Sequence, residues 1–121
     1  MYHDAELSTR ILWLSRHHPE PLQRDLLSEK FGEVTIIVYE KSVETAFDVL
    51  TIFQAESCHE MVVVLPVDIL AELISLLKKL NMIVRPLRAV MKRELLDHGG
   101  IANQFSHFER IIDLYLLTEP L

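Results

Sequence analysis

The segment best suited to chemistry is a run of four polar residues, Ser15-Arg16-His17-His18, directly after a short apolar stretch at 11–14. A guanidinium can hold a phosphate through two parallel hydrogen bonds, a hydroxyl can add another, and a histidine can carry a proton near neutral pH. We therefore predict a site for a small anionic ligand, with Ser15 and Arg16 as ligand-binding residues and His17 as the catalytic candidate. The same run is also typical of a chain that simply reaches water after a strand.

A second pair of cations follows the apolar residues 82–84. We expect Arg85 and Arg88 to form the opposite wall of the same crevice. On a long edge strand, however, the same two charges would serve equally well to prevent strand-to-strand aggregation. Lys78 and Lys79 fall at the predicted carboxyl end of a helix, where the helix dipole explains them without a ligand.

Other kinds of site lack the residues that would carry them. The chain has no GxGxxG, GxxxxGK[ST] or GxSxG motif, and its six histidines show no metal-binding spacing. Its single cysteine, Cys58, excludes an intramolecular disulfide and a cysteine-based zinc site, and we interpret it as a packing residue. We expect no metal and no cofactor. The pair Gly99-Gly100 is either a plain turn or a mobile lid over a pocket.

The formal net charge of −6 argues against general nucleic-acid binding, which usually needs a basic surface. The charge is uneven, because residues 73–93 contain no acid but hold six of the 12 basic residues. A local basic face of this kind suits a compact anionic ligand. We expect neither export nor membrane insertion, since residues 1–10 have no apolar signal region and no apolar run approaches about 20 residues. A reducing, cytoplasmic location fits the cysteine content.

The elements that must position these residues follow from the apolar pattern. Short apolar runs alternate with helical periodicity, which predicts a single α/β domain over 1–121 with a three-layer, Rossmann-like open sheet. Strands are expected at 11–14, 34–39 and 61–65, the last one central because it has no polar interruption. Three helices are expected. The first covers 21–31, with Leu22, Leu26 and Leu27 inward. The second begins after a cap at Ser42, with Phe47 inward, and the third runs from 66 to 81. In such a sheet the ligand crevice lies beyond the carboxyl ends of the strands, where Ser15 to His18 are expected.

The pattern changes after residue 81. A fourth strand is expected from 82 to 91, with an edge or bulge at Pro86, which cannot donate to a strand ladder. Residues 92–107 have no helical period, so a parallel crossover is not expected. We predict a long strand at 108–117 that pairs antiparallel to the fourth. Because both strands are apolar on both faces and few helices cover the sheet, we also predict a homodimer.

The strand ending Leu14-Ser15-Arg16-His17, followed by Pro19, Leu22 and Gln23, resembles the opening of small CRISPR-associated Rossmann-like proteins of the ring-nuclease kind. The resemblance implies a role in antiviral defence and the binding and metal-independent cleavage of a cyclic oligoadenylate across a dimer two-fold, with Ser15, Arg16 and His17 as the transferable positions. The closing segments 105–110 and 118–121 look like those of uncharacterised small prokaryotic or viral α/β proteins, which implies no activity.

Two classes of function follow. One is a nucleotide-binding protein with phosphodiesterase activity, or a nucleotide sensor without turnover. The other is a non-enzymatic dimeric regulatory or protein-interaction module. Binding of nucleotides to the purified protein would separate the two classes.

Overall fold

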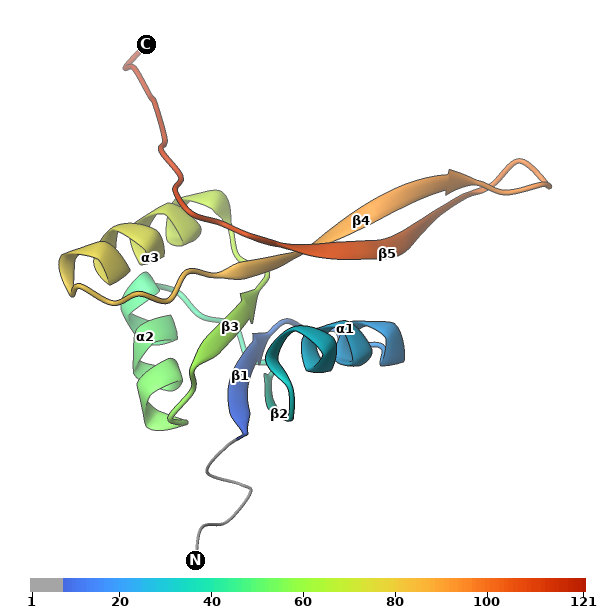
Figure 1. The fold of residues 1–121 in the computed structure, drawn as a ribbon. Coiled ribbons are helices and arrows are strands. Elements are labelled where there is room, and N and C mark those ends of the chain that lie inside the picture. Colours follow the sequence, from blue (N-terminus) through green and yellow to red (C-terminus); the bar gives the residue numbers. More distant parts are fainter. Residues whose placement is uncertain (1–7) are drawn as a thin grey trace, which may run out of the picture.

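Three βα units follow one another in the computed structural model, which describes residues 8–121, and a β-hairpin completes the sheet (Figure 1). The elements are β1 (Thr9–Leu14), α1 (Pro21–Phe31), β2 (Val34–Tyr39), α2 (Ala46–Ala55), β3 (Glu60–Val63), α3 (Val67–Lys79), β4 (Leu87–Leu95) and β5 (Ile101–Arg110). The predicted α/β class is confirmed. The expectation about export rests partly on residues 1–7, which lie outside the described residues.

The strands form one sheet in the order β2-β1-β3-β4-β5. Neighbours are parallel except β4 and β5, which pair antiparallel. β3 is therefore the middle strand, as the uninterrupted apolar run at 61–65 predicts. The mixed sheet with an antiparallel ending is also confirmed.

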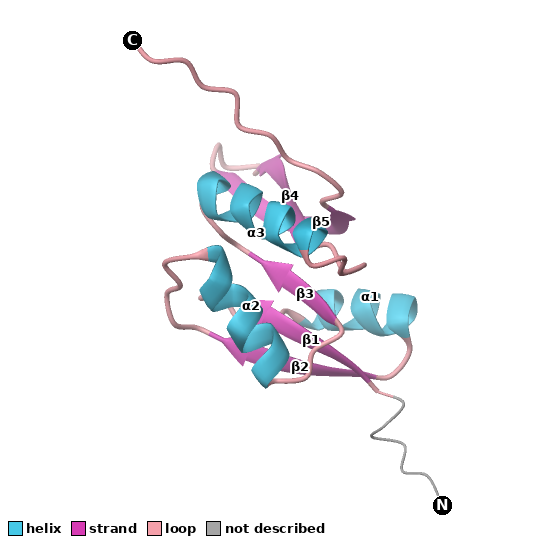
Figure 2. Cartoon of the chain, turned by 90° about the vertical axis from the view of Figure 1, so that its left-hand side faces the viewer, coloured by secondary structure: helices cyan, strands magenta, loops and turns pink. Residues whose placement is uncertain are grey.

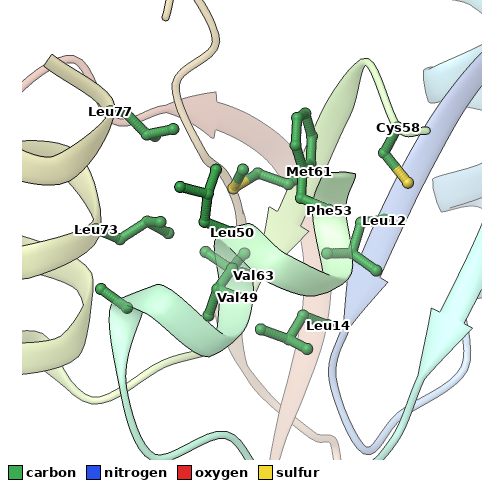
Figure 3. Close-up of a cluster of buried hydrophobic side chains, with 11 residues drawn as sticks. Leu12, Leu14, Val49, Leu50, Phe53, Cys58, Met61, Val63, Leu73 and Leu77 are labelled. Carbon is green, nitrogen blue, oxygen red and sulfur yellow. The ribbon is translucent and has the colours of Figure 1, made fainter. Parts of the chain in front are cut away.

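The helices cover the two faces of the sheet unequally. α2 and α3 lie together on one face, and α1 lies on the other (Figures 1 and 2). Side chains from β1 and β3 alternate between the two faces: Leu12 and Met61 join the larger cluster against α2 and α3 (Figure 3), whereas Trp13 and Val62 join a smaller cluster under α1. The α1 face thus has the thinner cover. None of the helices among residues 8–121 has the length and apolar character needed to cross a membrane.

The start of α2 differs from the prediction. Its cap is Thr45 and not Ser42, because Thr45 and Asp48 form a reciprocal box: Thr45 Oγ1 accepts from the Asp48 amide, and an Asp48 carboxylate oxygen accepts from the Thr45 amide, both at 3.1 Å. The buried stripe is Ala46, Val49, Leu50 and Phe53. Phe47 was wrongly expected inward, since it lies one position off this stripe and is exposed.

In α1 the expected range is correct but one inward residue is wrong. Gln23 and Leu27 are the buried residues, whereas Leu22 lies on the outer side of the first turn and is 52% exposed. The helix begins with a box in which Gln23 Oε1 accepts from the Glu20 amide at 2.8 Å.

The last two strands both lie closer to the turn that joins them than predicted: β4 lies later in the chain and β5 lies earlier. β4 begins at Leu87, after Pro86 rather than before it, because the proline has no N–H for the ladder. β5 covers 101–110, so the prediction of a strand at 108–117 is correct only at 108–110 and wrong over 111–117. The hairpin closes at Leu96 to Gly100, where the Leu96 amide donates to the Gly100 carbonyl at 2.7 Å and Gly99 has φ +90°. The glycine pair is therefore a turn.

Candidate functional site

A cleft of about 340 Å³ lies at the carboxyl ends of three neighbouring parallel strands, β2, β1 and β3. This is the edge at which the sequence predicts a crevice. The loop after each strand contributes to its wall, and the lining residues are Leu14, Ser15, Arg16, His17, Tyr39, Glu40, Lys41, Ser42, Val43, Val64, Leu65 and Pro66. The structure therefore brings Ser15, Arg16 and His17 together in one cleft.

The loop after β1 is tied to the core through its backbone. The buried Trp13 donates its indole N–H to the His17 carbonyl at 2.6 Å, and the His17 amide donates to Ser15 Oγ at 3.1 Å. Trp13 in turn packs edge-on against Phe108, with ring centroids 6.2 Å apart. These contacts fix the path of the loop while the side chains of Arg16 and His17 remain exposed.

Charge pairing decides which side chains of the cleft remain available. His18 and Glu40 form a contact between the loops after β1 and β2, which occupies the carboxylate. Among residues 8–121, Arg16 and Lys41 have no side-chain hydrogen bond and no ion pair, and both are exposed. The cleft lining thus holds two cations without a partner among the described residues, and one acid, Glu40, which contacts His18 through one carboxylate oxygen.

The helix N-termini contribute less to anion binding than the fold rule suggests. At the start of α2 the side chains of Thr45 and Asp48 accept hydrogen bonds from backbone amides, and at the start of α1 the side chains of Glu20 and Gln23 do the same. α3 carries Asp68 in its first turn, with its carboxylate accepting from the Ile69 amide at 2.9 Å. Acidic side chains at these positions offset the positive end of the helix dipole. Attraction of an anion therefore depends on Arg16 and Lys41.

Arg85 and Arg88 do not form the expected opposite wall, since neither lines the cleft. Arg85 precedes β4 and donates to the carbonyls of Met82 and Val84, both at 2.8 Å. The prediction placed Arg85 at the end of a strand, but Pro86 delays the strand, so Arg85 lies at its beginning. Arg88 is paired with Glu109 across the hairpin at 2.8 Å.

The second cation of the cleft is Lys41, which sequence reasoning did not select. The signal was present, because Lys41 lies two residues beyond β2 and the carboxyl-end rule applies to it as it does to Arg16. The sequence prediction instead took Arg85 and Arg88, which belong to the basic segment 73–93, as the second source of positive charge. The residues of this segment are divided among α3, the following loop and β4, and Lys78 is bound to Asp113.

Cys58 lies at the opposite end of β3 from the cleft, in the core cluster of Figure 3. Burial raises the pKa of its thiol, with Arg10 lowering it and Glu56 raising it to smaller extents. A buried thiol that resists ionisation is a poor nucleophile. These observations agree with the interpretation of Cys58 as a packing residue.

No group of three His, Cys, Asp or Glu side chains among residues 8–121 is arranged to hold a metal ion. Comparison of the chain with protein-family models, with curated proteins and with solved structures finds no match. The site must therefore be interpreted from its own geometry.

Proposed function

We propose that the protein binds a small phosphorylated ligand of the nucleotide class in the cleft at the carboxyl ends of β1, β2 and β3. The observation that carries this proposal is the placing of two cations without partners among residues 8–121, Arg16 and Lys41, in one cleft with the Ser15 hydroxyl. Arg16 suits bidentate contact with phosphate oxygens, and Lys41 supplies a second positive charge.

The remaining wall of the cleft suits the apolar part of a nucleotide. Val43, Val64, Leu65 and Pro66 line it together with Tyr39. Val64 is 67% exposed although it directly follows the central strand, so a ligand on it would cover apolar surface. A cleft of about 340 Å³ is near the lower limit for small-molecule sites. It suits one nucleotide unit, and a cyclic oligoadenylate would extend beyond it.

His17 is the residue we propose for metal-independent cleavage of a ribonucleotide phosphodiester. The 2′-oxygen would form a bond to phosphorus as the phosphorus–O5′ bond breaks. His17 would accept the 2′-hydroxyl proton, and the leaving O5′ would take a proton from solvent water, giving a cyclic phosphate and a free hydroxyl. Among residues 8–121 no carboxylate holds the His17 ring in place. The geometry therefore supports binding more strongly than cleavage.

Binding is tested by calorimetric titration of the purified chain with AMP. Arg16→Ala should weaken binding by roughly 1–3 kcal/mol, the scale of a charge-assisted hydrogen bond, and Lys41→Ala should weaken it in the same direction. Arg24→Ala is the matched control, because Arg24 is an exposed arginine on α1 outside the cleft. Equal affinity of the Arg16 variant and the control would overturn the proposal.

Cleavage is tested separately by mass spectrometry of cyclic tetra-adenylate incubated with the protein and a chelator. His17→Ala should keep AMP affinity and abolish the linear products, whereas His98→Ala in the hairpin turn should change neither. Binding without any product would leave a nucleotide sensor. If no nucleotide binds, the protein-interaction alternative replaces both.

A further inference from the structure

The β4–β5 hairpin extends far beyond the rest of the sheet (Figure 1). β4 has one register pair with β3, Val62 with Leu87, but nine with β5, from Leu87 with Arg110 to Leu95 with Ile101. Most of the hairpin is therefore a two-stranded arm. An isolated two-stranded hairpin is at best marginally stable in water, so an arm of this length calls for packing on one face.

One face of the arm carries two apolar cross-strand pairs on either side of the polar pair Arg93 and Asn103. Met91 pairs with Phe105 and Leu95 pairs with Ile101, which places these four side chains on the same side. A register shift at Val90/Met91 adds a residue to β5, so Phe105 and Phe108 share this face and stack at 4.8 Å. Phe105 is buried against the base of the arm, but Met91, Leu95 and Ile101 are 48%, 79% and 59% exposed. We call Met91, Leu95, Ile101 and Phe105 the arm face.

The opposite face of the arm is polar. It carries Arg88 with Glu109, and Lys92 with Gln104, as cross-strand pairs. Within the arm, the strongly exposed apolar side chains Met91, Leu95 and Ile101 therefore lie on the side of the sheet that α1 only partly covers. A groove of about 410 Å³ continues from the arm face between α1 and the base of the hairpin. Its lining is apolar at Leu26, Leu27, Phe31, Leu87 and Phe108 and polar at Lys30, His107 and Arg110.

α1 presents a stripe beside this groove that matches the arm face in chemistry. Leu22, Asp25, Leu26 and Glu29 follow the i, i+3, i+4, i+7 spacing of one helix face. Leu22 and Leu26 are apolar, with Leu22 half exposed, and Asp25 and Glu29 are exposed acids. We call these four residues the α1 stripe.

The charges of the two surfaces are complementary. Arg93 lies on the arm face between Met91 and Leu95 and is exposed. Among residues 8–121, neither Arg93 nor Asp25 nor Glu29 has an ion-pair partner. The hairpin as a whole holds four basic against three acidic residues, in a chain whose net charge is −6. The complementarity is therefore local: Arg93 on the arm face can pair with the exposed acids Asp25 and Glu29 of another copy.

We propose that two copies of this chain exchange arms, each laying its arm face over the α1 stripe and groove of the other, with Arg93 against Asp25 and Glu29. The contact is isologous, because each copy gives one arm and receives one, and so it closes into a dimer. None of the residues of this interface lines the cleft, so the interface does not depend on the proposed ligand.

The test is the dimer dissociation constant of the full chain, measured by sedimentation or light scattering over a concentration series. Leu95→Glu should raise this constant at least about tenfold, because a charge would enter an apolar contact. Ile83→Glu is the matched control: Ile83 is 96% exposed, precedes β4 outside the arm, and should leave the constant unchanged. Circular dichroism should show the same fold in both variants.

A charge reversal identifies the partner surface. Arg93→Glu should weaken the dimer, and adding Asp25→Arg and Glu29→Arg to the same chain should restore it, since both contacts are reversed together. A monomeric wild-type chain at roughly 100 µM would overturn the proposal. A dimer unaffected by Leu95→Glu, equally weakened by Ile83→Glu, or not restored by the triple exchange would also overturn it.

Discussion

Arg16 and Lys41 are available for a ligand because the charged groups around them have other partners. Glu40 lies next to Lys41 in the chain, yet it contacts His18, and Asp48 and Asp68 accept hydrogen bonds from backbone amides at the starts of α2 and α3. Arg88 shows the contrary case, since its guanidinium is held by Glu109. Identical residue types thus serve structure in one place and remain available for a ligand in another.

Asp113 shows the same effect of pairing on a titrating group. Lys78 holds the pKa of the Asp113 carboxyl below its ordinary value, and the Tyr115 hydroxyl, which donates at 2.8 Å, lowers it further. A pKa that is lower in the folded than in the unfolded protein stabilises the fold above the unfolded pKa, and this contribution is lost as the pH falls through the folded pKa. We expect the contact of Asp113 with Lys78 on α3 to be fully present at neutral pH and to weaken as the pH falls below the ordinary aspartate pKa of about 4.

The measurement is a ¹³C NMR titration of the Asp113 carboxyl. Lys78→Ala should move the pKa upward toward the ordinary value for an aspartate. Lys79→Ala, the neighbouring lysine at the end of α3, should leave it unchanged. Equal shifts in both variants would mean that general charge, rather than the contact with Lys78, sets the pKa.

At the scale of elements, the beginning of α2 gives a direct test of local structure. Thr45→Ala removes the side-chain acceptor of the Asp48 amide and should destabilise the protein by about 1 kcal/mol in denaturant unfolding. Ser42→Ala should have almost no effect, although Ser42 is the cap that periodicity suggests. A larger loss for the Ser42 variant would contradict the assignment of the cap.

The elements that the sequence predicts well are those defined by local signals. α1 and β2 have their expected ends because Pro21, Gly32 and a compact apolar run mark them. The cap of α2 was missed because Ser42 and Thr45 are both good caps, and the choice depends on Asp48 three residues after Thr45. The ends of β4 and β5 depend on pairing between segments. Residues 111–117 are mostly apolar, as in a strand, but no neighbouring strand pairs with them.

For the whole molecule, the topology accounts for the part of the site that could be predicted. Parallel strands bring the ends of β1, β2 and β3 to one edge, so Ser15, Arg16 and His17 were predictable from the chain together with this rule. The opposite wall of the cleft was not predictable in the same way, because its residues depend on where β4 begins, and Pro86 moves that start to Leu87. The exposed arm face also belongs to this scale, since it depends on the register in which β4 pairs with β5.

The single tryptophan provides the most direct test of the cleft as a phosphate-binding site, because Trp13 donates to the backbone of His17 in the cleft wall. The measurement is the equilibrium change in Trp13 fluorescence on titration with AMP and, separately, with adenosine. We expect a saturable change with AMP that weakens with added salt and with Arg16→Ala, and a much weaker response to adenosine, which lacks the phosphate. Equal responses to AMP and adenosine, or an AMP response unchanged by Arg16→Ala in a folded protein, would contradict the proposed function.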